Sequence, residues 1–204
     1  MDLLTAKLKL EAIIGRDLRE MAEQYNVTVF KQGNLNKGWA GHVLESYLGL
    51  GLDSSQAPNG GTWELKLVPL VYRNGVLHPK ETMAITMIDP YQVRDTPFEE
   101  SHLLQKLRII LLCARIYESK QETHSILRIV KTAGLDDPKL YGQVKADYDL
   151  VRETIRSQGF QHLHGRMGKY VQPRTKGPGH GSTSRAFYAR TNFLSILLGL
   201  TPIR

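Results

Sequence analysis

Apolar residues recur with helical spacing in several parts of the chain. They return every three or four positions, a pattern typical of helices that bury one face. The pattern predicts helices over residues 3–14, 18–25, 39–50, 138–157 and 192–200. Asp17 is a candidate N-cap of the second helix, and Asp136-Asp137-Pro138 is suited to begin the long fourth one.

Shorter apolar runs between these helices predict strands. They cover residues 63–71, 82–88, 109–116, 126–130, 170–173 and 186–189. Arg73-Asn74-Gly75 signals a turn after the first run, so strands 63–71 and 82–88 are expected to form a hairpin with a slightly long connection. The mixture of helices and short strands indicates an α/β or α+β fold.

Length and composition fit one folded domain, or one domain built as two lobes. The chain has 204 residues, of which 41% are hydrophobic. Its one cysteine, Cys113, excludes a disulfide scaffold and favours a reducing compartment. No apolar run reaches the roughly 18 residues of a membrane span, so we expect a soluble, cytoplasmic protein without a membrane partner.

The net charge of +7 comes from the C-terminal part of the chain. Residues 155–204 contain no acidic residue and eight basic ones, which leaves the first 154 residues at −1. The eight are Arg156, Arg166, Lys169, Arg174, Lys176, Arg185, Arg190 and Arg204. Such a face attracts polyanions through counterion release, although a solvated basic surface has the same composition.

A candidate catalytic triplet, Glu64-Leu65-Lys66, lies on the predicted strand 63–71. Side chains alternate along a strand, so Glu64 and Lys66 should point to the same face. Carboxylates hold a hard cation such as Mg²⁺, which activates water and stabilises negative charge in phosphodiester hydrolysis. The lysine can position that water or stabilise the charge. Alone, the triplet is weak evidence, because most such triplets are simply solvated strand residues.

The block that contains this triplet and four further blocks follow one another in a recognisable order. They read KGWAG at 37–41, WELKLVP at 63–69, SHLLQKL at 101–107, YVQPRTK at 170–176 and RAFYARTNF at 185–193. Together they resemble the MutH-type DNA endonuclease family of the PD-(D/E)xK superfamily. The resemblance implies a restriction-endonuclease-like mixed β-sheet flanked by helices, with two lobes forming a DNA-binding cleft. We expect one domain over 1–204, with a catalytic lobe at about 1–130 and a basic recognition part at 131–204.

The resemblance also implies roles for individual residues. Glu64 would be a ligand of Mg²⁺ and Lys66 the catalytic lysine. Glu45 would be an additional acid near the metal, although an exposed helix acid is the simpler interpretation of its position. Lys37 and Lys106 would be auxiliary lysines near the active site.

The segment 172–185 is the candidate DNA-reading element. Its glycines allow close approach of the backbone, and arginine and lysine can read guanine in the major groove. The family pattern puts base contacts at Arg174 and Lys176 and further DNA contacts at Arg185 and Tyr188. Composition alone also fits a flexible linker, and Tyr188 also fits a core aromatic.

One position departs from the family pattern. The family has a metal-binding aspartate in the loop before the ELK strand, typically after proline, whereas here Pro58 is followed by Asn59. Asn59 is the equivalent position if the proline is the guide, and Asp53 is the alternative source of the carboxylate. An uncharged amide binds a divalent cation poorly.

These features favour a sequence-specific, Mg²⁺-dependent endonuclease acting on double-stranded DNA, of the type II restriction kind. A cognate DNA methyltransferase would then be its partner. One alternative is a strand-nicking mismatch-repair endonuclease activated by MutL. The other is a catalytically inactive DNA-binding variant, for which Asn59 is the supporting feature. The stretch between Lys176 and Arg185 is shorter than in the repair enzymes, which favours restriction.

Overall fold

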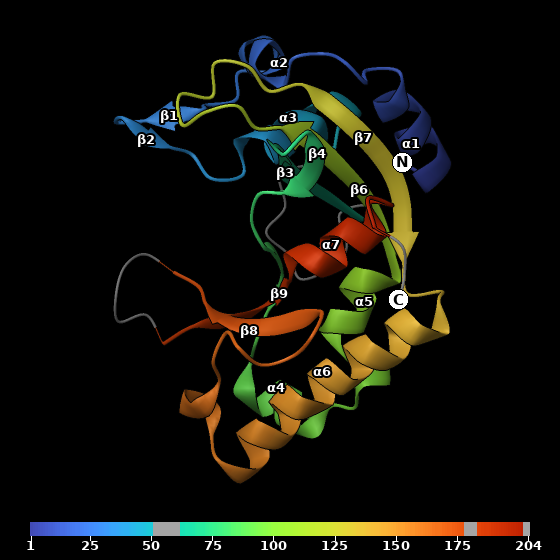
Figure 1. Ribbon diagram of the computed structural model, residues 1–204, viewed down its shortest axis with the longest axis vertical. Coiled ribbons are helices and arrows are strands. Elements are labelled where there is room, and N and C mark those ends of the chain that lie inside the picture. Colours follow the sequence, from blue (N-terminus) through green and yellow to red (C-terminus); the bar gives the residue numbers. More distant parts are fainter. Residues whose placement is uncertain (51–61, 178–182, 202–204) are drawn as a thin grey trace. The chain divides into compact units, whose positions relative to one another are not determined.

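The computed structural model describes residues 1–50, 62–177 and 183–201, which fold into two compact units (Figure 1). The first unit comprises Met1–Lys80 and Ile110–Ala133, and the second comprises Glu81–Ile109 and Gly134–Arg204. The second unit therefore takes in residues 81–109, which precede the expected lobe boundary at residue 130.

A four-stranded mixed sheet forms the centre of the first unit. Its strand order is β4-β3-β6-β7. The strands are β3 (Glu64–Arg73), β4 (Val76–Pro79), β6 (Ile109–Ile116) and β7 (Leu127–Gly134). Strand β3 runs parallel to β6 and antiparallel to β4. The six inner residues of β6 are all buried, and five of them are apolar, as expected for a strand inside a sheet. The sixth is Arg115, which pairs with Glu122.

Within the described residues, three helices and a short hairpin complete the first unit. They are α1 (Leu3–Glu11), α2 (Leu18–Gln24), β1 (Phe30–Lys31), β2 (Asn34–Leu35) and α3 (Trp39–Leu48). The predicted cap of α2 is confirmed, because the Asp17 carboxylate accepts a hydrogen bond from the Arg19 N–H. Helix α3 packs against β3 and buries Trp39, Val43 and Leu44.

The second unit is built on a three-stranded antiparallel sheet with the order β5-β9-β8. Its strands are β5 (Met83–Met87), β8 (Val171–Thr175) and β9 (Arg185–Ala189). Its helices are α4 (Pro90–Asp95), η1 (Phe98–Glu100), α5 (His102–Arg108), α6 (Pro138–Ser157), η2 (Phe160–His162) and α7 (Thr191–Leu197). The long helix α6 contacts β8, and α5 contacts β5.

The predicted hairpin between strands 63–71 and 82–88 is wrong. Asn74 and Gly75 both have positive φ, +50° and +77°, and form a tight turn that brings Val76 opposite Arg73. This two-residue turn suits the twist of an antiparallel pair, so the chain returns at once as β4. The later run forms β5, which pairs with β9 in the second unit.

The mixed architecture confirms the prediction that helices accompany a sheet of both parallel and antiparallel strands. Within residues 1–50, 62–177 and 183–201, no helix combines the length and apolar character that crossing a bilayer requires.

Candidate active site and nucleic-acid interface

Glu64 and Lys66 lie together on one face of β3, as their spacing predicts. The Lys66 Nζ is 2.7 Å from the Glu64 Oε1. Glu64 is only 2% exposed, whereas about a quarter of the Lys66 side chain, 24%, reaches solvent. A carboxylate removed from water needs a compensating charge or hydrogen bonds, and the ammonium group of Lys66 supplies such a charge.

The sheet explains why the carboxylate is buried. Glu64 is the first residue of β3 and stands opposite Ile110 of the buried strand β6. Its neighbours in sequence, Trp63 and Leu65, are themselves buried. The chain thus holds an acid in an apolar setting at the start of a rigid strand, with its partner lysine two residues further on.

Two other predicted site residues belong to the same unit. Lys37 is exposed and lies two residues before α3, which follows Gly38 in a left-handed conformation with φ +93°. Glu45 is partly buried on α3 itself, the helix that packs against β3. Both residues therefore come from the segment that covers the strand with the Glu64–Lys66 pair.

The donor chemistry of this unit suits a hard cation. Mg²⁺ is commonly held by one or two carboxylates together with water and substrate phosphate oxygens, and Glu64 and Glu45 offer carboxylates. Among the residues that the structure describes, no cluster of three or more His, Cys, Asp or Glu side chains could hold a metal alone. Asp53 and Asn59, the two candidate loop ligands, lie outside the described residues.

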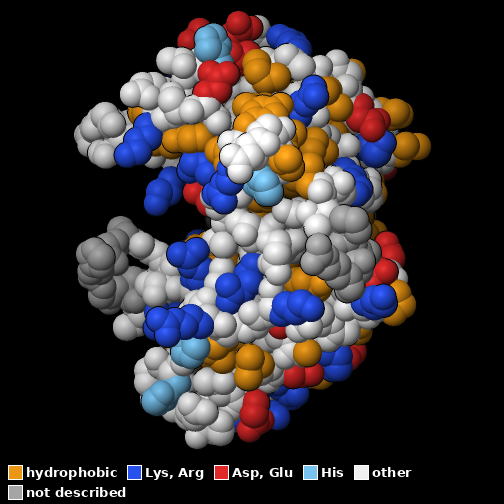
Figure 2. Space-filling view, viewed as in Figure 1, with side chains coloured by type: hydrophobic (Ala, Val, Ile, Leu, Met, Phe, Trp, Pro, Cys, Tyr) orange, Lys and Arg blue, Asp and Glu red, His pale blue; other side chains and the backbone are white. Residues whose placement is uncertain are grey.

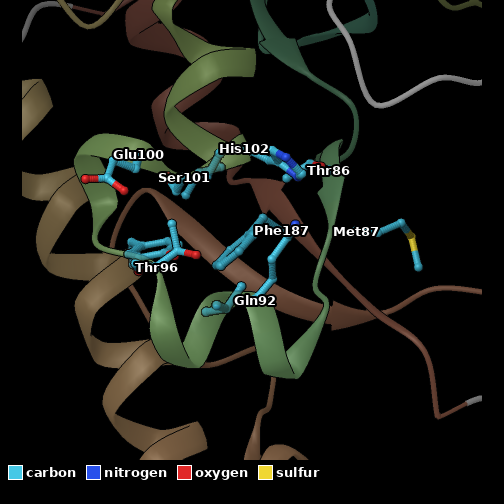
Figure 3. A pocket seen from close by; sticks show the side chains of 11 residues that line it. Thr86, Met87, Gln92, Thr96, Glu100, Ser101, His102 and Phe187 are labelled. Carbon is cyan, nitrogen blue, oxygen red and sulfur yellow. The ribbon is translucent and has the colours of Figure 1, made fainter.

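Lys106 belongs to the second unit, on α5, where it is 7% exposed. The start of this helix is fixed by Ser101, whose hydroxyl accepts a hydrogen bond from the Leu104 N–H and donates one to the Phe98 carbonyl. Figure 3 shows Ser101 and His102 at a small pocket that Phe187 of β9 also lines. The first residues of the SHLLQKL block therefore have a structural role, because they cap and position the helix that carries Lys106.

Arg174 is exposed at the end of β8 and is held there by two contacts. Its Nη1 donates a hydrogen bond of 2.9 Å to the Thr82 hydroxyl, and its guanidinium carbon lies 5.7 Å from the centre of the Tyr188 ring. Tyr188 stands opposite Gln172 in the β8–β9 pairing. Both contacts orient the guanidinium without neutralising its charge.

The β8–β9 pairing extends beyond the strands to Lys176, whose backbone N–H donates to the Ser184 carbonyl. The Lys176 side chain is exposed. Arg185 is partly buried, and its Nη1 donates to the Thr175 hydroxyl at 2.8 Å. Figure 2 shows Lys and Arg side chains gathered over this part of the second unit. The arrangement therefore displays positive charge on a paired ribbon, as a polyanion-binding surface requires.

Comparison with known proteins shows which family the chain resembles. The sequence model described as "DNA mismatch repair enzyme MutH" matches residues 53–141. The chain is 26% identical to the DNA mismatch repair protein MutH of Vibrio cholerae, over 93% of this chain and 92% of that protein. The Vibrio campbellii protein of the same name is also 26% identical, over 93% and 90%. These similarities support the MutH-like endonuclease family for this chain.

The MutH-like family also includes a restriction enzyme among the relatives. The type II restriction enzyme Sau3AI of Staphylococcus aureus is 27% identical, over 80% of this chain and 37% of that enzyme. The family match and the mixed sheet with its helices confirm the predicted restriction-endonuclease-like α/β fold class. The chain is accordingly similar to MutH-like nucleases.

Sequence reasoning missed three residues that hold strand β8 and the segment before it. Asp147 is buried and accepts backbone hydrogen bonds from Lys169, Tyr170 and Val171. The sequence did contain a signal for Asp147, because this carboxylate lies within the apolar stripe of α6. Gly168, with φ +71°, and Thr82 gave no comparable signal in the sequence.

Proposed function

We propose that this MutH-like nuclease is a Mg²⁺-dependent endonuclease that hydrolyses phosphodiester bonds in double-stranded DNA. The observation that carries the proposal is the buried Glu64 carboxylate, paired at 2.7 Å with Lys66 at the start of β3. An acid and a lysine on one strand face are the groups that metal-assisted hydrolysis requires from the protein.

Glu64 and Glu45 would hold the metal, with a third oxygen ligand from Asn59 or Asp53. When bound, Mg²⁺ lowers the pKa of a water molecule and stabilises the negative charge of the phosphoryl group. Lys66 would then turn from the Glu64 carboxylate to the reacting phosphate, where its ammonium group orients water or offsets charge. Lys37 would add positive charge around the phosphate, and Lys106, in the second unit, stays a predicted auxiliary lysine.

DNA recognition would belong to the ribbon of β8 and β9. Arg174 and Lys176 would reach base edges in the major groove, where both residue types can pair with guanine. Arg185 and Tyr188 would contact DNA beside them. The proposal of a sequence-specific enzyme depends on the orientation that Thr82 and the Tyr188 ring impose on Arg174.

Within this chemistry we favour a type II restriction enzyme with a cognate DNA methyltransferase as partner. It would act in the cytoplasm, where its substrate lies. The 27% identity to Sau3AI supports restriction. A strand-nicking repair enzyme activated by MutL is the second candidate. The MutH relatives support it, since they match this chain over nearly their whole length.

The test is cleavage of supercoiled plasmid DNA by the purified full chain, with Mg²⁺ or with EDTA. A restriction enzyme produces linear fragments with Mg²⁺ alone. A repair nickase produces open circles, at a rate that MutL and ATP increase. If only the Asn59→Asp variant cleaves, the chain is an inactive DNA-binding form. If neither protein cleaves under any of these conditions, the proposed activity is wrong.

A further inference from the structure

A polar hollow lies beside the recognition strand in the second unit. The residues around it include Thr82, Arg166, Lys169, Gln172, Arg190 and Asn192. All of its lining residues in the described part of the chain are neutral or basic. A concave surface of this composition has a positive potential and offers several hydrogen-bond donors, which suits an anion.

One buried side chain in the hollow is available to a ligand. Gln172 is 4% exposed and lines the hollow from β8. Among the described residues, no hydrogen bond to its side-chain amide is found, and the amide is not one of the fully enclosed polar atoms that lack a partner, so it keeps some contact with solvent. Its NH₂ group can donate to a phosphate oxygen that enters the hollow.

Arg166 and Lys169 are the two exposed cations of the hollow, and other side chains hold the loop that carries them. Arg190 donates to the backbone carbonyls of Gly165, Met167 and Gly168, at 2.9, 2.9 and 3.0 Å. This network ties down the segment that carries Arg166.

The backbone of Lys169 is held by a separate pair of side chains. The buried Asp147 carboxylate accepts the backbone N–H of Lys169 at 2.8 Å, and Asn192 donates to the Lys169 carbonyl at 3.2 Å. The backbone that presents Lys169 is therefore ordered before any ligand arrives, which lowers the entropy cost of binding.

Thr82 links the hollow to Arg174. It lines the hollow, and its hydroxyl also accepts the hydrogen bond from the Arg174 Nη1. An anion in the hollow would therefore lie next to the side chain proposed to read a base. In protein–DNA complexes, phosphate contacts set the register in which neighbouring side chains meet the bases.

We propose that this hollow binds one backbone phosphate of the DNA and thereby sets the register of Arg174. The inference rests on the proposed function and adds to it a phosphate site formed by Arg166, Lys169 and Gln172. The same chemistry fits free phosphate, so the test must separate the two sources.

The experiment measures binding to a DNA duplex across a salt series, with EDTA present so that cleavage plays no part. The double variant Arg166→Ala/Lys169→Ala should bind roughly tenfold or more weakly at one fixed salt concentration. Its salt slope should fall by about one, equally on every sequence. Gln172→Leu should weaken binding but keep the slope, because it removes a neutral donor. Lys139→Ala is the matched control, since Lys139 is an exposed cation of the same unit at the start of α6.

Three results would overturn the inference. An unchanged slope and affinity in the double variant would show that the hollow does not meet DNA phosphate. A thermal stabilisation of the wild type by inorganic phosphate, lost in that variant while DNA binding is kept, would assign the hollow to a free anion. A wild-type chain that neither binds nor cleaves DNA would remove the proposed function as well. If the wild type cleaves DNA but the double variant keeps the wild-type salt slope, only the inference is wrong.

Discussion

The two units carry their functional charges in opposite ways. In the first unit, Glu64 is buried and its charge is balanced by Lys66 at 2.7 Å. In the second unit, Arg174 and Lys176 are exposed, and the contacts that orient Arg174 come from a hydroxyl and an aromatic ring. One region holds a compensated pair, and the other presents Arg174, whose orienting contacts leave its charge in place.

This difference matches the ligands that each region is proposed to meet. A buried carboxylate is costly without a counter-charge, so Lys66 stabilises the metal-free protein and must share that role when a cation binds. Exposed guanidinium and ammonium groups cost little to maintain and attract a polyanion over a distance set by salt. Variants in each region should therefore fail in different assays.

The largest expected effect is the loss of cleavage in Glu64→Gln. An amide cannot replace the carboxylate as a ligand of Mg²⁺, so the cleavage rate should fall at least about 1,000-fold, equivalent to about 4 kcal/mol. Binding to DNA in EDTA should stay close to wild type, because the recognition ribbon is untouched. Plasmid cleavage and duplex binding, measured on the same preparation, check both statements.

The matched control is Glu23→Gln, which removes an acid whose side chain is 75% exposed on α2. It should cleave normally. Near-normal cleavage by Glu64→Gln would contradict the proposed difference between the two units, because the Glu64–Lys66 pair would then have only a structural role.

The sequence was sufficient where the signal was local. Glu64 and Lys66 are two residues apart, so strand alternation alone predicts their shared face, and the distance confirms it. The long helix α6 was predicted because its apolar stripe runs over several turns from a clear start at Pro138. Helix α5 was not predicted, since its seven residues lead without a break into the apolar strand β6.

The remaining features depend on contacts between distant segments. Thr82 and Arg174 are 92 residues apart, and no pattern in either segment predicts their hydrogen bond. The pairing of β5 with β9 likewise joins residues about a hundred positions apart in the sequence, which is why the run at 82–88 was assigned to the wrong hairpin. The metal site could not be completed from the sequence, because Asn59 breaks the family pattern.

The next effect concerns the scaffold of the recognition ribbon. A Cβ at Gly168 would lie 1.9 Å from the Val171 carbonyl oxygen, and φ there is +71°. Gly168→Ala should therefore destabilise the protein by about 3 kcal/mol or more, and it should weaken DNA binding. Gly142→Ala is the control, because nothing lies within 4 Å of that position on α6. It should stabilise by about 0.5–1 kcal/mol. Urea denaturation measures both values, and equal stability of the two variants would contradict the structure.

A smaller effect should appear in sequence discrimination. Arg174→Ala should cost about 1–3 kcal/mol on the preferred site and much less on a site altered at one base pair. Tyr188→Phe should keep the ring contact and nearly all of this discrimination, whereas Tyr188→Ala should lose part of it. Binding to the preferred duplex and to single-base variants at fixed salt is the measurement. Equal losses on all sequences would mean that Arg174 contacts only the backbone.

The smallest expected effect concerns a contact within the first unit, between His124 and Asp17. His124 Nδ1 lies 2.8 Å from the Asp17 carboxylate. That hydrogen bond and the negative charge of Asp17 raise the pKa of His124. Burial raises the pKa of Asp17, but hydrogen bonds from Arg19, His124 and Ser125 outweigh it and leave that pKa lowered.

The signs of the two shifts define a pH window for this contact. A raised His124 pKa contributes stability that is fully present below the unfolded value near 6.5 and is lost as pH rises through the folded pKa. The lowered Asp17 pKa contributes stability above the unfolded value near 3.8, which is lost on acidification. Both charges therefore act together at about pH 5.5. His124→Ala should lower the Tm by no more than about 2 °C at that pH and by less at pH 8.5. His162→Ala, at an exposed histidine of the second unit, is the control, and an equal loss at both pH values in His124→Ala would show that the contact acts only as a neutral hydrogen bond.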